Sequence, residues 1–388
     1  MSFLERGFEK SEFEKRTLKT QKMMAEQKLD AVFLTTEPNV RYFSGFFTQF
    51  WESPTRPWFL IIPATGKPIA VIPEIGASGM AATWIDDIHT WTSPDPSDDG
   101  TTLVANILNN LSRKYGRIGA TLGVESHIRM PFNNFIELSS RLNHIEFIDI
   151  ATQIHCLRSV KSEAEIEKIR KACETAHTGF ANISNHARTG QTERDICKQM
   201  HIDMLEAGAD IIKYLISGSG PDGYDSIIMG PTDRRLNQGD VLIIDVGAVY
   251  DGYFSDFDRN FAFGSPSDAT LRAYNTVYEA TDAGFKIARP GATTTDVFNA
   301  MWSVMEAAGA LGNNVGRLGH GLGMQLTEWP SITEFDNTQL VPGMVITLEP
   351  GMMYAPGKFM VHEENIVITE AGAEYLSVRC SPELIIIE

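Results

Sequence analysis

VLIIDVGAVYDGYFSDFDRNF, residues 241–261, is the stretch that decides the fold of this chain. It opens with an apolar run typical of a buried strand and reaches Asp245, where a charge requires a partner. The turn signal Asp251-Gly252 predicts a hairpin whose returning strand carries Asp256 and Asp258. If Asp245 and Asp256 pair across this hairpin, either one carboxyl stays protonated or a cation lies between them. Taken alone, the stretch also fits an acidic, solvated loop.

Three further segments of the C-terminal half set polar residues against β-type runs. His320 lies in the glycine-rich segment GHGLG, Glu349 ends the apolar run MVITLEPG, and Glu363 opens the run VHEENIVI. Together with Asp245 and Asp256 they supply four carboxylates and one imidazole. This set suits a pair of hard or borderline divalent ions better than a single structural zinc ion.

The ordered motifs DVG, SDFDR, GHGLG, LEPG and HEEN resemble the pita-bread metallohydrolases, which include aminopeptidase P, prolidase, methionine aminopeptidase and the metal-free creatinase. The resemblance implies an α/β (α+β) fold in two domains. A creatinase-type three-layer N-terminal domain is expected over residues 1–152. A pita-bread catalytic domain, with a curved antiparallel sheet flanked by helices, is expected over residues 153–388.

The resemblance also assigns five metal ligands. They are Asp245, Asp256, His320, Glu349 and Glu363. In the family's arrangement Asp256 and Glu363 bridge two ions, Asp245 completes one site, and His320 with Glu349 completes the other. The implied cofactors are thus two divalent metal ions. Carboxylate-rich sites accept manganese, iron, cobalt and zinc, and we take manganese as the first expectation.

By the same resemblance the expected reaction is hydrolysis of a small peptide or amide, as in Xaa-Pro dipeptidase and aminopeptidase P. A hydroxide bridging the ions would attack the scissile carbonyl, and Glu349 would pass a proton to the leaving amine. His362, next to Glu363 in the chain, is a second candidate catalytic residue.

The chain departs from the peptidases of this family at two positions that usually carry histidine. Ile227 and Ile228 stand where one imidazole is expected, and Thr327 stands at the other position. Loss of one oxyanion-stabilising donor typically costs ~10²–10³ in turnover. The substitutions therefore predict weak turnover of Xaa-Pro dipeptides. They leave open a non-peptidase alternative, either ectoine hydrolase-like C–N hydrolysis or dimethylsulfoniopropionate lyase-like elimination, and Glu328-Trp329-Pro330 briefly resembles the lyase branch.

Candidate substrate-binding residues follow from these departures and from one loop. Ile228, Thr327 and Trp329 are the candidates in the C-terminal half. The Pro-bounded segment 47–57, FTQFWESPTRP, carries Trp51 and Arg56 and is simply interpreted as a surface loop with an anchoring tryptophan. In the family, however, the N-terminal domain often covers the site of a neighbouring subunit. That resemblance implies a homodimer in which Trp51 or Arg56 reaches the partner's substrate.

Composition narrows the remaining possibilities. The net charge of −17 argues against nucleic acid or an anionic membrane as a partner, which leaves a small-molecule or dipeptide substrate. The four cysteines show no CxxC spacing, which favours reduced thiols. The N-terminal stretch lacks the apolar core of a signal peptide, and no run approaches ~20 apolar residues, so we expect a cytoplasmic protein. A non-catalytic binding protein is the third class considered, and the intact ligand set argues against it.

Hydrophobic periodicity predicts alternating helices and strands up to about residue 150 and two pairs of helices beyond it. The expected helices are 11–29, 102–115, 132–142, 163–186, 193–208, 271–288 and 294–310, and segment 38–45 is expected to be a turn.

Overall fold

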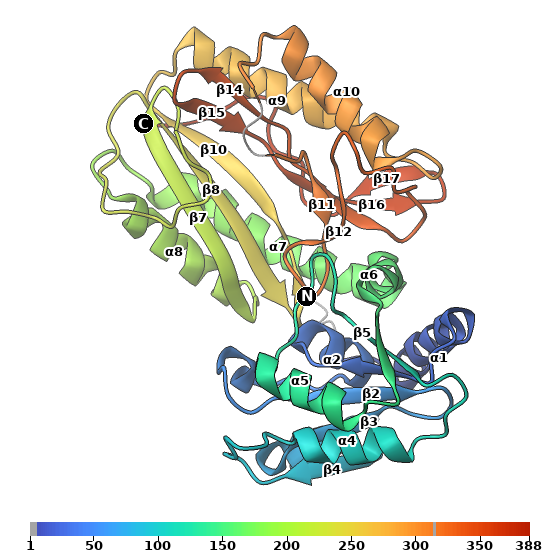
Figure 1. The fold of residues 1–388 in the computed structure, drawn as a ribbon. Helices are drawn as coiled ribbons and strands as arrows, with labels where there is room; N and C mark the ends of the chain where they lie inside the picture. The colour runs from blue at the N-terminus through green and yellow to red at the C-terminus, as the bar shows by residue number, and fades with distance from the viewer. Residues whose placement is uncertain (1–5, 313–315) are drawn as a thin grey trace. The chain divides into compact units, whose positions relative to one another are not determined.

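The computed structural model describes residues 6–312 and 316–388 and divides the chain into two compact units, Met1–Leu157 and Arg158–Glu388. Figure 1 shows the ribbon of both units. The boundary expected between residues 152 and 153 falls inside helix α6 (Ala151–Ser159), which runs through the division.

The N-terminal unit is built on one six-stranded mixed sheet with strand order β4-β3-β2-β1-β5-β6. β1 pairs antiparallel with β2 and parallel with β5, so the sheet combines a hairpin with crossover connections. Its strands are β1 (Ala31–Leu34), β2 (Phe59–Pro63), β3 (Ile69–Pro73), β4 (Asp87–Trp91), β5 (Arg117–Ala120) and β6 (Glu146–Asp149). Its helices are α1 (Lys10–Gln27), α2 (Glu37–Ser44), α3 (Ala77–Ala81), α4 (Thr101–Asn110) and α5 (Phe132–Arg141), with 3₁₀ turns at Gln49–Glu52 and Glu74–Gly76.

Helix α2 replaces the turn that was expected over residues 38–45, so that prediction is wrong. Pro38 lies in the first helical turn, where its missing N–H costs nothing. Gly45 ends the helix with a φ of 76°, a left-handed conformation that favours glycine. The Pro and Gly that suggest a turn are here the two ends of a short helix.

The C-terminal unit contains two main sheets, antiparallel except for the parallel pair of β10 and β18, and a hairpin. One sheet runs β18-β10-β8-β7 with β9 beside β8, the other runs β12-β11-β13-β16-β17, and β14 pairs with β15. The strands of the first sheet are β7 (Ile211–Pro221), β8 (Asp240–Tyr250), β9 (Tyr253–Phe254), β10 (Phe257–Phe263) and β18 (Ile385–Ile387). The others are β11 (His320–Gly321), β12 (Glu328–Ser331), β13 (Val345–Leu348), β14 (Gly351–Ala355), β15 (Lys358–Val361), β16 (Glu364–Thr369) and β17 (Gly372–Tyr375).

Two pairs of helices cover these sheets, as the periodicity predicts. α7 (Glu163–His186) and α8 (Glu193–Glu206) pack against β7 and β8, while α9 (Asp268–Ile287) and α10 (Thr294–Ala307) lie together beside β14 and β15 (Figure 1). α7 begins with a capping box in which Ser162 and Glu165 satisfy each other's backbone N–H groups. The arrangement is the helix-flanked antiparallel plan expected for this half.

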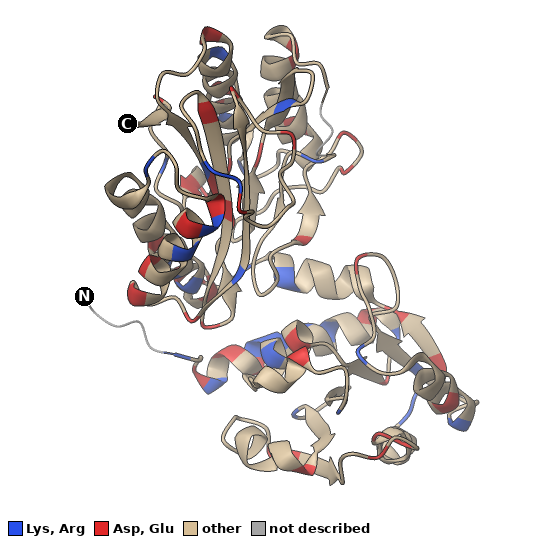
Figure 2. Cartoon of the chain, turned by 90° about the vertical axis from the view of Figure 1, so that its left-hand side faces the viewer, with Lys and Arg blue, Asp and Glu red and all other residues tan. Residues whose placement is uncertain are grey.

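The core of the C-terminal unit lies between its helices and strands. Val277 of α9, Met301 of α10, Leu348 of β13 and Ile366 of β16 are fully buried members of one apolar cluster. Acidic residues nevertheless lie on the strands of this unit as well as on its helices (Figure 2). No helix in the described ranges is both long and apolar enough to cross a membrane.

Candidate metal centre

The β8–β10 hairpin places its aspartates in a different register from the expected one. β8 and β9 are joined by Asp251-Gly252, with φ values of 47° and 85°, the signature of a two-residue hairpin turn. The antiparallel pairing therefore sets Asp258, and not Asp256, opposite Asp245. Directly paired residues of neighbouring strands share a face, so Asp245 and Asp258 point the same way, and Asp256 lies just before β10 begins. The pairing prediction is wrong by two residues, because the hairpin is centred between Asp251 and Gly252, whereas pairing of Asp245 with Asp256 requires a centre one residue earlier.

Asp256 is held by the second sheet. Its backbone N–H donates to the Asn365 Oδ1 atom at 2.9 Å, and the Asn365 amide donates back to the Asp256 carbonyl. Asn365 belongs to β16, so this pair of bonds joins the two sheets of the C-terminal unit where the ligand residues lie. The Asp256 side chain is 3% exposed.

His320 is oriented as a metal ligand. Its Nδ1 atom lies 2.9 Å from the carbonyl oxygen of Gly321, which accepts only if Nδ1 carries the proton. Nε2 then presents a lone pair, and it lies 3.4 Å from the Asp256 Oδ2 atom. The close approach of the strands depends on Gly319, where φ is 147° and an added Cβ would meet the Thr347 carbonyl oxygen at 2.3 Å.

The two glutamates lie at the ends of neighbouring strands. Glu349 follows β13, and its backbone N–H donates to the Leu318 carbonyl oxygen at 3.0 Å. Glu363 stands between β15 and β16 and is 2% exposed. One ligand atom each from Asp256, His320 and Glu363 lies within 4.8 Å of the other two.

The electrostatics of this cluster favour the binding of a cation. Burial, reinforced by the neighbouring carboxylates, raises the pKa of Asp245 and of Glu363 well above the usual range. Burial also raises the pKa of Asp256 and of Glu349. The Asp245 Oδ1, Asp258 Oδ1 and Glu363 Oε1 atoms are buried and have no hydrogen-bond partner among the described residues. Unpartnered carboxylate oxygens beside the His320 imidazole form the donor set of hard and borderline divalent ions, so the residues fit the expected metals.

The ligand side chains differ in how far they are exposed to solvent. The side chain of Glu349 is 22% exposed, and Asp245 is also only partly buried, whereas Asp256, His320 and Glu363 are buried. The cluster is therefore most accessible at Glu349.

Tyr214 is a site residue that the motif search missed. A bulge after Ile212 shifts the β7–β8 register, so that Tyr214 pairs with Gly247 and shares the face of Asp245. Burial and the charges of Asp245, Asp256 and Glu363 raise the pKa of the Tyr214 phenol well above its usual range. The hydroxyl therefore keeps its proton. No motif marks this residue, since the bulge that turns it inward is not visible in the sequence.

Arg317 is the second residue missed. Its Nε atom lies 3.7 Å from the Glu349 Oε1 atom, and its Nη2 donates to the Thr327 hydroxyl at 3.1 Å. Its charge opposes the rise in the pKa of Asp256 and of Glu349. The signal that marks it is its position three residues before His320.

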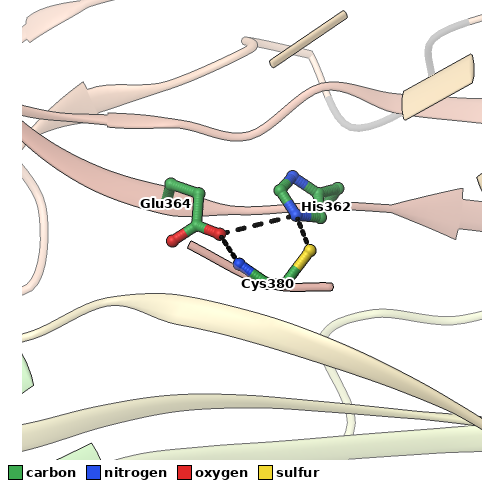
Figure 3. A group of neighbouring side chains, drawn as sticks. All are labelled: His362, Glu364 and Cys380. Carbon is green, nitrogen blue, oxygen red and sulfur yellow. Dashed lines mark hydrogen bonds and ion pairs between the residues drawn. The ribbon is translucent and has the colours of Figure 1, made fainter. Parts of the chain in front are cut away.

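The predicted catalytic His362 lies in a different cluster. It precedes Glu363, but its ring contacts Thr281 of α9 at 2.7 Å from Nδ1 and the Cys380 sulfur at 2.7 Å from Nε2. Figure 3 shows its imidazole beside the Cys380 sulfur, with Glu364 on the same side. Burial lowers the pKa of His362 well below the usual range, so the ring is neutral. Both ring nitrogens are engaged here, and we do not carry His362 forward as a catalytic group.

The predicted substrate-binding residues of the C-terminal unit have different surroundings. Thr327 contacts Arg317 and so borders the site. Ile228 is 77% exposed, and Ile227 packs against the hydrophobic core, so the two do not form an apolar wall together. Trp329 is half-buried on β12.

Glu328, which precedes Trp329, is a structural residue. Its carboxylate pairs with Arg158 and, at 3.2 Å, with Lys161, and all three side chains are buried. Burial alone would raise the pKa of Glu328, but the two cations outweigh it and lower the pKa to about 2. Because Glu328 is fully paired, the Glu-Trp-Pro segment gives no support to lyase chemistry.

The two candidates of the N-terminal unit are engaged within that unit. Trp51 is 7% exposed, with its ring centroid 6.0 Å from that of Trp58 and the Arg129 guanidinium 5.0 Å from its ring. The Arg56 Nε atom donates to the Ser93 hydroxyl at 3.0 Å. Trp51 thus has the anchoring position of the simpler interpretation, and substrate contact by either residue stays a prediction.

Comparison with known proteins places this geometry in a family. Residues 167–371 match the model of metallopeptidase family M24, and residues 16–160 match the creatinase/prolidase N-terminal domain. The chain is 30% identical over 389 residues to the probable dipeptidase PepE of Mycobacterium tuberculosis, covering 98% of each chain. It is 31% identical to the Xaa-Pro dipeptidase of Pyrococcus furiosus, covering 93% of this chain and 97% of that one.

A solved structure agrees with these relatives. The dipeptidase PepE of Mycobacterium ulcerans superposes with a TM-score of 0.85 at 27% identity, covering 98% of this chain and 99% of that one. Fold, motifs and full-length similarity agree, and the chain belongs to metallopeptidase family M24, with a creatinase/prolidase N-terminal domain.

Proposed function

We propose that the protein is a dipeptidase that uses two divalent metal ions to hydrolyse the peptide bond of small dipeptides, Xaa-Pro dipeptides among them. The observation that carries the proposal is the cluster of Asp256, His320 and Glu363, whose ligand atoms lie within 4.8 Å of one another. The unpartnered oxygens of Asp245 and Glu363 add to it. Family membership and the dipeptidase relatives support the reaction class.

The residues that would hold the metals are Asp245, Asp256, His320, Glu349 and Glu363. Bound there, the ions would polarise the scissile carbonyl and activate water. Glu349 is the partly exposed carboxylate, and burial raises its pKa, so it is suited to accept a proton and deliver it to the leaving amine. The Tyr214 hydroxyl, kept protonated beside Asp245, donates a hydrogen bond to that carboxylate and so helps to hold it in place as a ligand.

Metal identity, assembly and compartment complete the proposal. Four carboxylates against one imidazole favour manganese, and iron, cobalt and zinc are the alternatives for the assay. A homodimer is supported by Phe47 and Phe50, which are 52% and 40% exposed in the loop that would cover a neighbouring site. The absence of CxxC spacing supports a cytoplasmic location.

The non-peptidase alternative loses the observations on which it depended. An apolar pocket for a compact substrate would require the side chains of Ile227 and Ile228 to lie together, but Ile228 is exposed and Ile227 packs against the core. Its short resemblance to the lyase branch rested on Glu328, which is held by Arg158 and Lys161.

The test is an assay of the protein loaded with manganese, iron, cobalt or zinc. The panel contains Ala-Pro, Ala-Ala, a longer Xaa-Pro peptide, ectoine and dimethylsulfoniopropionate. We expect turnover of Ala-Ala with kcat/KM at or above the ~10⁴ M⁻¹s⁻¹ of ordinary enzymes, and weaker turnover of Ala-Pro because two histidines of the family's peptidases are replaced here. Turnover of ectoine or dimethylsulfoniopropionate with none of the dipeptides would overturn the proposal.

A further inference from the structure

Arg317 is a cation at the open side of the metal centre. Its Nε atom lies 3.7 Å from the Glu349 Oε1 atom, and its side chain is 30% exposed, compared with 22% for Glu349. Both groups are accessible, so a molecule that reaches Glu349 also reaches the guanidinium. Arg317 therefore lies beside a metal-ligand residue without being one of the five expected ligands.

Thr327 fixes the direction of this guanidinium. Its hydroxyl accepts a hydrogen bond from Nη2 at 3.1 Å. Within the ranges 6–312 and 316–388, Nη1 makes no hydrogen bond, so one edge of the planar group keeps donors available. A guanidinium held in this way is preorganised to grip a carboxylate with parallel N–H···O bonds.

The negative charge of the ligand set explains why a cation at this position would help to bind a substrate. The ligand set carries four carboxylates, which repel any anionic part of a substrate. The ion pairs of this set include those of Glu349 with Arg317 and of Asp256 with His320. Since His320 is expected to serve as a ligand, Arg317 is a cation at the partly exposed side that can meet an anion. Metal ions bound to Glu349 would offset its charge and weaken its hold on the guanidinium.

We propose that Arg317, positioned by Thr327, binds a carboxylate group of the substrate. This rests on the proposed dipeptidase function and deepens it. A dipeptide is a zwitterion whose terminal carboxylate lies only a few bonds from the scissile carbonyl. A cation beside Glu349 is within reach of that carboxylate when the carbonyl is at the metals. An acidic side chain on the substrate has the same chemistry, and the experiment separates the two.

The test compares substrates that differ only in charge. Wild type, Arg317→Gln, Arg317→Lys and Thr327→Val are assayed with Ala-Pro and Ala-Pro amide, and with Asp-Pro and Asn-Pro, after the metal content of each protein is matched. Loss of a charge-assisted hydrogen bond predicts a rise in KM of ~10–100-fold for Ala-Pro in Arg317→Gln, with kcat nearly unchanged. Ala-Pro amide should show no rise. Arg317→Lys should recover part of the loss, and Thr327→Val should show a smaller one.

Arg170→Gln is the matched control. Its side chain is 33% exposed and pairs with Glu167 at 3.2 Å, as Arg317 pairs with Glu349, but it lies on helix α7. This variant should leave all four substrates unaffected. A loss confined to Asp-Pro relative to Asn-Pro assigns the contact to the acidic side chain. An equal loss on the charged and neutral members of both pairs, or no loss, overturns the proposal.

A binding measurement separates this inference from the proposed function. Calorimetric titration of the metal-loaded proteins with proline and prolinamide requires no turnover. Proline should bind wild type at least about 10-fold more tightly than Arg317→Gln, and prolinamide should bind both equally. If wild type hydrolyses no dipeptide but shows this difference, the function is wrong and the carboxylate contact stands. If proline binds both proteins equally, the contact is wrong whatever the assay shows.

Discussion

Glu363 and Glu364 are neighbours in the chain, both buried, and they have opposite electrostatic surroundings. Glu364 accepts hydrogen bonds from the Arg259 guanidinium at 3.1 Å and from the Cys380 backbone N–H at 2.9 Å, and it also pairs with Arg379 at 3.4 Å. The Oε1 atom of Glu363 has no hydrogen-bond partner in the described part of the chain, and carboxylates surround this residue.

The partners of the two glutamates distinguish a structural carboxylate from a metal ligand. A buried charge is tolerated when its partners are part of the fold, as the two arginines are for Glu364. A buried carboxylate without such partners is expected where a bound cation neutralises it. The His362–Glu364–Cys380 group looks like a metal site by residue type (Figure 3), but the Arg379 Nη1 atom lies 2.8 Å from the His362 Nε2 atom. A guanidinium already stands where a metal would bind.

The largest effect is expected from Asp256→Ala. This change removes a ligand that contacts His320 and is expected to bridge both ions. Activity should fall below detection, and added manganese should no longer raise the melting temperature, because metal binding would no longer favour the folded state. Asp282→Ala, at a carboxylate that pairs with Arg379 away from the centre, is the control and should keep both properties.

Glu364→Gln should instead cost stability. Breaking a buried ion pair from one side typically costs about 3–5 kcal/mol, because the arginines are left uncompensated. We expect a loss of this size in the free energy of unfolding, measured by urea denaturation with metal present. A loss below about 1 kcal/mol would mean that the arginines do not compensate this carboxylate.

Glu328 provides the pH-dependent test of a compensated carboxylate. Its pKa falls from 4.5 to about 2, so it contributes stability above pH 4.5 that is lost as the pH falls toward 2. A shift of this size corresponds to roughly 3 kcal/mol. Glu328→Gln should therefore destabilise the protein near neutral pH and flatten its stability profile between pH 5 and pH 2. Parallel profiles for wild type and variant would contradict the pairing with Arg158 and Lys161.

The smallest effect is expected at an exposed pair. Arg170 and Glu167 lie on one helix at 3.2 Å, with side chains 33% and 45% exposed. Solvent screens such pairs, so Arg170→Gln should change the free energy of unfolding by less than about 0.5 kcal/mol. A loss as large as that of Glu364→Gln would show that burial is not what separates the two classes.

Local signals made much of the fold predictable. Helix α7 was expected over residues 163–186 and begins and ends there, because Ser162 and Glu165 form a capping box that can be read directly. The five ligand residues were expected from motifs at strand ends. Three of them, Asp256, His320 and Glu363, lie within 4.8 Å of one another.

Non-local geometry was not predictable in the same way. The hairpin register depends on a two-residue turn, and Tyr214 faces Asp245 only because a bulge shifts its strand by one residue. His362 and Glu363 lie between β15 and β16, and the His362 ring contacts Thr281 and Cys380, residues far from it in the chain. Arg317 belongs to the site through its contact with Thr327, a pairing that no spacing rule indicates.

Metal content in the two neighbouring glutamate variants tests the central claim most directly. Wild type, Glu363→Gln and Glu364→Gln are loaded with manganese, freed of excess metal and measured by elemental analysis at a temperature where circular dichroism shows each to be folded. We expect two ions per chain in wild type and in Glu364→Gln, and at most one in Glu363→Gln. Two ions retained in Glu363→Gln, or equal metal loss in both variants, would contradict it.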